Sequence, residues 1–128
     1  GSDGKAHLDG RRLLLIEDEP LVAFELAATL EDAGGHIVGQ AATVADALAL
    51  IDQAECDLVL LDGNLQGEGV EQVARVLADR AMPFLFVSGY GRDHLPEAFD
   101  AVPVIEKPFK VADLIDAIAK LAVPATEK

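Results

Sequence analysis

The feature that most constrains the fold is a set of short apolar runs without polar alternation. The runs at residues 13–16, 58–61 and 84–87 are the clearest. Runs of this length are typical of strands buried on both faces of a parallel sheet, because neither face tolerates polar side chains. Two weaker runs complete the pattern. The predicted strands are therefore residues 13–16, 37–41, 58–61, 84–87 and 102–105.

Helical patterns separate the predicted strands. In the first of them Val22, Leu26 and Leu30 recur at helical spacing, and similar stripes lie within residues 44–51, 70–77 and 114–121. The segment 89–101 contains two glycines and a proline. This segment is too broken for a full-length helix, so we expect one short, mobile helix there.

Strand and helix alternate five times along the chain, which indicates right-handed crossovers and helices on both faces of one parallel sheet. The expected fold is α/β, a flavodoxin-like doubly wound sheet of five strands in the order 2-1-3-4-5. Pro103 agrees with this order, since proline cannot donate to a strand ladder and the fifth strand is then at an edge. Ligands of such folds bind outside the carboxyl ends of strands one and three.

Length and composition indicate one domain. The chain has 128 residues, of which 51% are hydrophobic, and the single cysteine, Cys56, cannot form an internal disulfide. We expect a tag or disordered N-terminus over residues 1–10, the domain over 11–122 and a tail over 123–128, with no output domain following. A reducing, cytoplasmic location is the default.

The charge balance excludes several partners. Ten Lys and Arg against 23 Asp and Glu give a net charge of −13. Nucleic-acid binding draws much of its affinity from basic side chains, and anionic membranes are disfavoured for the same reason. The sequence also contains neither a run of the roughly 20 apolar residues that cross a membrane nor the apolar stretch of a signal peptide near its start.

Acidic residues follow the first strand and end the third. Glu17 and Asp18 come directly after one run, and Asp62 ends the other. Like charges about 4 Å apart repel by about 4 kcal/mol at an effective dielectric constant of about 20, so a cation must offset them. The ligands are hard oxygens, without His or Cys and too few for a calcium cage. The sequence therefore predicts a Mg²⁺ site.

Two further residues complete the same rim. Ser88 ends the fourth strand and Lys107 follows the fifth. A hydroxyl donor and an ammonium group suit phosphoryl oxygens, and phosphoryl transfer depends mainly on positioning and charge neutralisation. The predicted nucleophile is Asp62, whose carboxylate is able to form an aspartyl phosphate.

The motifs LLLIEDEP, DLVLLDGN, FVSGYG and IEKPF resemble, in this order, the receiver domain of two-component response regulators. The resemblance spans roughly residues 11–122. It implies that Glu17 and Asp18 hold Mg²⁺, that Asp62 accepts a phosphoryl group from a kinase phosphohistidine, and that the backbone carbonyl of Asn64 is a further metal ligand. Ser88 and Lys107 take the switch-hydroxyl and lysine roles, and Pro108 follows a bond that is commonly cis in this family.

The chain departs from the usual pattern of the family at several positions. Val104 stands where typical receivers have a switching aromatic, and Gln66 replaces a common proline. The stretch Ser88-Gly-Tyr90-Gly resembles an atypical, often single-domain receiver group with a Phe-x-Thr-Gly-Tyr motif, which is paired with sensor kinases of the HWE type. The glycines near Tyr90 suggest that the signal passes through reordering of residues 89–101.

Three functions remain open at this point. The first is a signalling receiver that is phosphorylated by a sensor histidine kinase or a phosphotransfer protein and acts by contact with a downstream protein. The second is a haloacid-dehalogenase-like Mg²⁺-dependent phosphatase, although Asn64 stands where that motif needs a second acid and the chain lacks room for a cap. The third is a degenerate receiver that serves only as a binding module, which the presence of Asp62, Ser88 and Lys107 disfavours.

Overall fold

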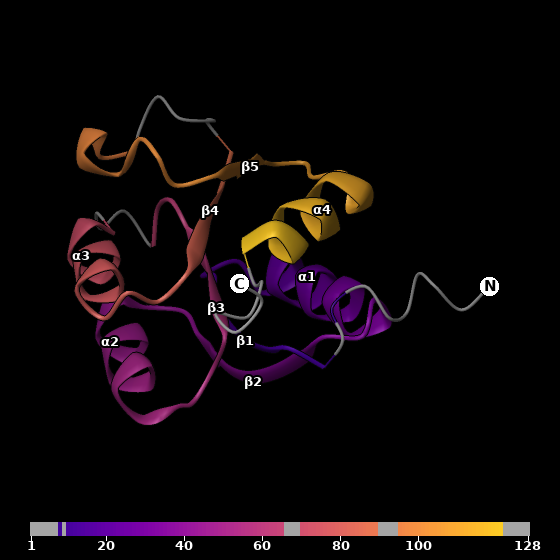
Figure 1. The fold of residues 1–128 in the computed structure, drawn as a ribbon, viewed down its shortest axis with the longest axis horizontal. Helices are drawn as coiled ribbons and strands as arrows, with labels where there is room; N and C mark the ends of the chain where they lie inside the picture. Colours follow the sequence, from indigo (N-terminus) through magenta and orange to yellow (C-terminus); the bar gives the residue numbers. More distant parts are fainter. Residues whose placement is uncertain (1–7, 9, 66–69, 90–94, 122–128) are drawn as a thin grey trace, which may run out of the picture.

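The structure, a computed structural model, describes residues 8, 10–65, 70–89 and 95–121. Five parallel strands form one sheet in the order β2-β1-β3-β4-β5, which confirms the predicted fold and order (Figure 1). The strands are β1 (Arg12–Ile16), β2 (His36–Ala41), β3 (Leu58–Asp62), β4 (Phe84–Ser88) and β5 (Val104–Glu106). The helices are α1 (Pro20–Asp32), α2 (Val44–Gln53), α3 (Glu71–Asp79), the 3₁₀ helix η2 (Glu97–Phe99) and α4 (Val111–Leu121).

The sheet separates two hydrophobic layers. On one side α1 and α4 pack against the sheet, and on the other side α2 and α3 do so (Figure 1). The central strands β3 and β4 are buried along their whole length, as their uninterrupted apolar runs predicted. Alternate residues of these strands therefore contribute to opposite layers, and both layers fix the same sheet.

Strand β5 differs from its prediction. The predicted strand covered residues 102–105, whereas the observed one begins at Val104. Pro103 has no N–H to donate and lies just outside the strand, although its carbonyl still accepts a 2.9 Å hydrogen bond from the Phe86 N–H. The edge position of β5 agrees with the prediction.

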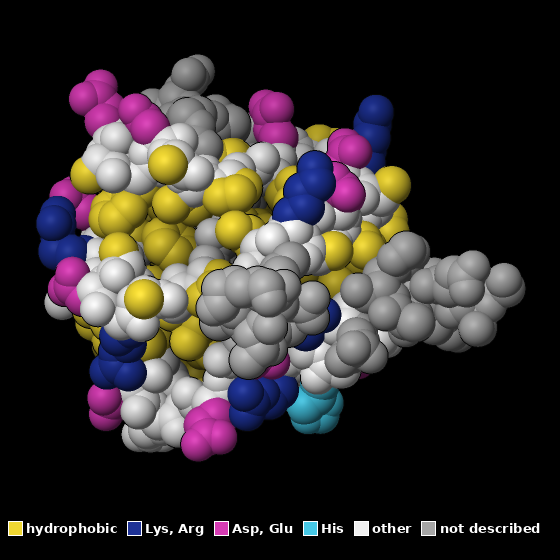
Figure 2. Space-filling view, viewed as in Figure 1, with side chains coloured by type: hydrophobic (Ala, Val, Ile, Leu, Met, Phe, Trp, Pro, Cys, Tyr) yellow, Lys and Arg dark blue, Asp and Glu magenta, His cyan; other side chains and the backbone are white. Residues whose placement is uncertain are grey.

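The side of the sheet next to β4 and β5 is covered sparsely. Among the described residues that link these two strands, helical structure is confined to the three residues of η2. Figure 2 shows hydrophobic surface gathered between η2 and α3. Val76, Val102 and Val104 on this side are only partly buried. This agrees with the expectation of a short fourth helix.

The packed part of the chain includes a residue that the predicted domain boundary left out. Leu8 lies within the expected N-terminal extension of residues 1–10, yet it is fully buried. Its N–H donates a 3.1 Å hydrogen bond to the carbonyl of Ala33, at the end of α1, and its side chain joins the α1–α4 layer. The core therefore takes in Leu8 as well as the residues from position 11 onward.

None of the helices that the structure describes combines the length and the apolar character needed to cross a bilayer.

Candidate functional site

Strand register brings the predicted acidic residues together. In the ladders Ile16 pairs with Leu61, so the next residues of these strands, Glu17 and Asp62, fall side by side. Carboxylate oxygens of Glu17, Asp18 and Asp62 all lie within 4.8 Å of one another. Glu17 and Asp62 are each 4% exposed, and Asp18 is half-buried. The predicted cluster therefore exists at the carboxyl end of the sheet.

Backbone hydrogen bonds fix the loops that carry the cluster. The Glu17 N–H donates to the carbonyl of Ala41, which continues the β1–β2 pairing past the end of the strand. Next to it, the Glu19 N–H donates to Glu17 Oε2 at 3.1 Å, and the Asn64 N–H donates to Asp62 Oδ1 at the same distance. The two carboxylates thus close their own turns.

Crowding shapes the electrostatics of the cluster. Burial is the largest cause that raises the pKa of Asp62, hydrogen bonds with the Asp18 and Glu17 carboxyl groups add to it, and together they bring the pKa to about 8. A buried carboxyl group among other acids resists ionisation, because the charged form loses its hydration and is repelled by the neighbouring carboxylates. Without a bound cation, Asp62 therefore retains a proton near neutral pH.

Lys107 supplies positive charge to the cluster. Its Nζ lies 3.1 Å from Glu17 Oε1, 3.3 Å from Glu19 Oε1 and 3.7 Å from Asp62 Oδ1. Burial by itself lowers the pKa of Lys107, but the attraction of Asp62 and Glu17 outweighs it, and the pKa lies above its ordinary value. The ammonium group is therefore charged and faces at least three acidic side chains with a single positive charge.

The donor set suits a divalent hard cation. Within the described part of the chain, the buried Glu17 Oε1 accepts no hydrogen bond, although Lys107 Nζ lies nearby. The clustered ligands are all carboxylate oxygens, which Mg²⁺ prefers, and one lysine leaves the cluster with excess negative charge. Glu17, Asp18 and Asp62 therefore fit the predicted cation.

Ser88 and Asn64 flank the cluster. The Lys107 N–H donates to the Ser88 carbonyl at 2.8 Å, which ties the ends of β4 and β5 together, and Ser88 is 3% exposed. Asn64 is exposed, two residues beyond Asp62. The Lys107–Pro108 peptide bond is cis, as the family resemblance implied. Tyr90 and Gln66, on which two further expectations rest, lie outside the described residues.

Sequence reasoning missed three residues next to the site. Glu19 pairs with Lys107, although its place before a helix gave it no separate signal. Gly63 directly follows Asp62 and lies beneath the side chain of Leu95, since a Cβ added to this glycine would lie 2.8 Å from Leu95 Cδ2. A glycine beside a predicted nucleophile was the available signal for this close approach.

Comparison with known proteins identifies the family. A model of the response regulator receiver domain matches residues 13–119. The chain belongs to this family. The receiver domain is 34% identical over 112 residues to the transcriptional regulatory protein PdtaR of Mycobacterium tuberculosis, with 84% of this chain and 55% of PdtaR covered. It spans about half the length of the curated relatives it matches.

Solved structures agree with this assignment. The solution structure of SdrG from Sphingomonas melonis Fr1 has 39% sequence identity and a TM-score of 0.79, and the match covers 89% of this receiver domain and 98% of that chain. A BeF3-activated conformation of SdrG from Pseudomonas melonis Fr1 has 38% identity and a TM-score of 0.74, with 88% and 96% covered. The receiver family is a family of signalling domains in response regulators, not of classical enzymes.

Proposed function

We propose that this receiver domain accepts a phosphoryl group on Asp62, with Mg²⁺ held by Glu17, Asp18, Asp62 and the backbone carbonyl of Asn64. The donor is a sensor histidine kinase, of the HWE type by family resemblance, or a phosphotransfer protein. The single observation that carries the proposal is the convergence of three carboxylates and Lys107 at the carboxyl end of the sheet. Function in the cytoplasm is part of the same proposal.

The chemistry assigns one role to each side chain. An Oδ atom of ionised Asp62 attacks phosphorus, the bond from phosphorus to the donor histidine nitrogen breaks, and that nitrogen retains the electron pair. Lys107 neutralises a phosphoryl oxygen and the Ser88 hydroxyl donates a hydrogen bond to another. When bound, Mg²⁺ offsets the negative charge of the carboxylates and of the phosphoryl oxygens.

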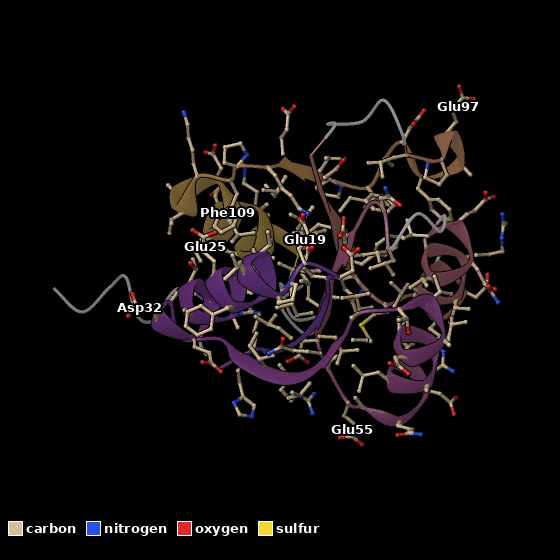
Figure 3. The ribbon with its side chains drawn as sticks, turned by 180° about the vertical axis from the view of Figure 1, so that it is seen from behind. Glu19, Glu25, Asp32, Glu55, Glu97 and Phe109 are labelled. Carbon is tan, nitrogen blue, oxygen red and sulfur yellow. The ribbon has the colours of Figure 1, made fainter. Side chains whose placement is uncertain are left out.

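The surface beside the site favours a protein donor. Leu21 and Phe24, in the first turns of α1, are 83% and 74% exposed, and α1 begins directly after Glu19. Large exposed apolar side chains near each other are typical of protein–protein contacts. Figure 3 shows Glu19 beside the start of α1, with Asp32 at the other end of that helix. A donor that reaches Asp62 therefore meets an apolar strip on α1 and an acidic rim.

Labelling with a small phosphodonor tests the proposal. We expect the chain to gain one phosphoryl group when it is incubated with Mg²⁺ and acetyl phosphate, and the Asp62→Asn variant to gain none. Intact mass spectrometry measures both. A lack of labelling together with a lack of response to beryllofluoride supports a degenerate binding module, and steady hydrolysis of small phosphomonoesters supports a phosphatase. Either result overturns the proposal.

A further inference from the structure

The glycine after the proposed phosphoacceptor is in close contact with a distant part of the chain. The Gly63 N–H donates a 3.1 Å hydrogen bond to the Val87 carbonyl, which holds the glycine beside β4. A Cβ added there would lie 2.8 Å from Leu95 Cδ2 and 3.4 Å from Ser88 Cβ and Oγ. Gly63 is therefore the point where the Asp62 loop, the end of β4 and Leu95 meet.

Leu95 is buried in the hydrophobic cluster on the α2–α3 side of the sheet. Its side chain is 8% exposed and belongs to the same hydrophobic cluster as Phe99, whose ring packs edge-on against Phe84 at a centroid distance of 6.2 Å. The Phe99 N–H donates to the Pro96 carbonyl, so the residues between these two anchors form a compact turn. A close-packed cluster transmits a displacement of Leu95 to this turn rather than absorbing it.

We propose that Leu95 is a positioning residue that couples the Asp62 loop to residues 95–102 through its contact with Gly63. The inference deepens the proposed function and rests on it in one respect, that Asp62 is the group modified. A phosphoryl group on Asp62 adds volume one residue away from Gly63, and the Leu95 side chain leaves no room for an extra carbon on Gly63 itself. Val104, at the position of the usual switching aromatic, has only a small side chain.

The steric contact is tested first without any phosphoryl analogue. In Gly63→Ala the new methyl group forces the Leu95 side chain to turn, so the backbone amide resonances of residues 97–102 shift relative to wild type. In the double variant Gly63→Ala, Leu95→Ala the space is vacated, and these resonances return toward their positions in Leu95→Ala alone. Gly89→Ala is the matched control, since a Cβ there meets no atom of the described residues within 4 Å.

The second arm adds beryllofluoride with Mg²⁺. In wild type we expect shifts at two sets of amides, the site reporters Gly63 and Ser88 and the segment reporters 97–102. In Leu95→Ala the site reporters still respond, while the segment reporters lose most of their response. Leu77→Ala, on α3, removes the same atoms from the same hydrophobic cluster. In this control variant we expect the segment reporters to respond as they do in wild type. Leu95→Met, which restores the bulk of the side chain, recovers the segment response.

The outcomes separate the two proposals. Retention of the full segment response in Leu95→Ala, or an equal loss in Leu77→Ala, overturns the coupling role of Leu95. If Leu95→Ala does not fold, Leu95→Val against Leu77→Val gives the same comparison with a smaller change in volume. A wild-type chain without any response to beryllofluoride overturns the proposed function, and the Gly63→Ala arm then decides the contact with Leu95 by itself.

Discussion

Asp62 combines two properties that conflict in the isolated domain. Its carboxylate must be ionised to attack phosphorus, yet burial together with the neighbouring Asp18 and Glu17 raises its pKa to about 8 from an ordinary value of 3.8. Between these values the folded chain holds a proton that the unfolded chain has released. The free energy of unfolding therefore decreases as the pH rises through this range, with a slope that approaches about 1.4 kcal/mol per pH unit.

This dependence is measurable in metal-free solution. Between about pH 5 and about pH 8 in the presence of EDTA, urea denaturation should show decreasing stability for wild type and a flatter profile for Asp62→Asn. Asp57→Asn is a suitable control. A hydrogen bond from Arg12 lowers the pKa of Asp57, so its stabilising effect is lost only as the pH falls below this window. Parallel profiles for wild type and Asp62→Asn would contradict the assignment.

Lys107 is the second residue whose removal has a defined consequence. Its side chain is 18% exposed and its Nζ approaches Glu17, Glu19 and Asp62. Lys107→Met leaves these acids without compensation, so metal-free stability at neutral pH should decrease by about 1–3 kcal/mol. The match is Lys120→Met on α4, whose side chain is 76% exposed and pairs with Asp116, and which should change stability by less than about 0.5 kcal/mol. If urea denaturation shows the same loss of unfolding free energy in both variants, Lys107 does not stabilise the carboxylate cluster.

At the scale of elements, the β1–β2 pairing depends on a glycine. The register shifts between Leu13, opposite Ile37, and Leu14, opposite Gly39. A Cβ at Gly39 would lie 2.9 Å from Leu50 Cδ1 and 3.2 Å from Leu14 Cδ2, so α2 packs directly on the strand backbone there. This close approach explains why an otherwise weak strand tolerates a glycine in its interior.

Gly39→Ala should therefore destabilise the fold by about 1–3 kcal/mol, because the methyl group displaces Leu50 or Leu14 from a filled layer. Gly89→Ala adds the same group where none of the described residues lies within 4 Å, and its stability should lie within about 0.5 kcal/mol of wild type. Thermal unfolding monitored by circular dichroism compares the two. Similar melting temperatures for both variants would mean that the β2–α2 contact is looser than the structure indicates.

Much of the element pattern could be predicted because it is local. Strands β3 and β4 follow from apolar runs, and the position of Asp62 and Ser88 at their ends follows from where the runs stop. The contact of Gly63 with Leu95 could not be predicted, because it joins residues 32 positions apart through packing rather than periodicity. The burial of Leu8 could not be predicted for the same reason, since a single apolar residue outside any run has no pattern of its own.

At the scale of the whole molecule, charge opposes folding in two ways. The net charge of −13 means that like charges repel one another over the surface, and three carboxylates converge at one end of the sheet. Dissolved salt weakens the first effect, since the screening length is about 10 Å at about 0.1 M salt. The carboxylate oxygens of the cluster lie within 4.8 Å of one another and are partly buried, so dissolved salt reduces their mutual repulsion far less.

Mg²⁺ and Na⁺ should therefore stabilise the domain to different degrees. At equal ionic strength both reduce surface repulsion, but only Mg²⁺ is expected to bind the carboxylate cluster, and a cation present at about 100 times its Kd adds about 2.7 kcal/mol. The difference between the melting temperatures in MgCl₂ and in NaCl of matched ionic strength measures the extra stabilisation by bound Mg²⁺. Asp18→Asn removes one negative ligand and should abolish most of that extra stabilisation, whereas Asp116→Asn, which removes an exposed charge on α4, should retain it. If MgCl₂ and NaCl stabilise wild type equally, the cluster binds no cation, and the surface charge alone accounts for the effect of salt.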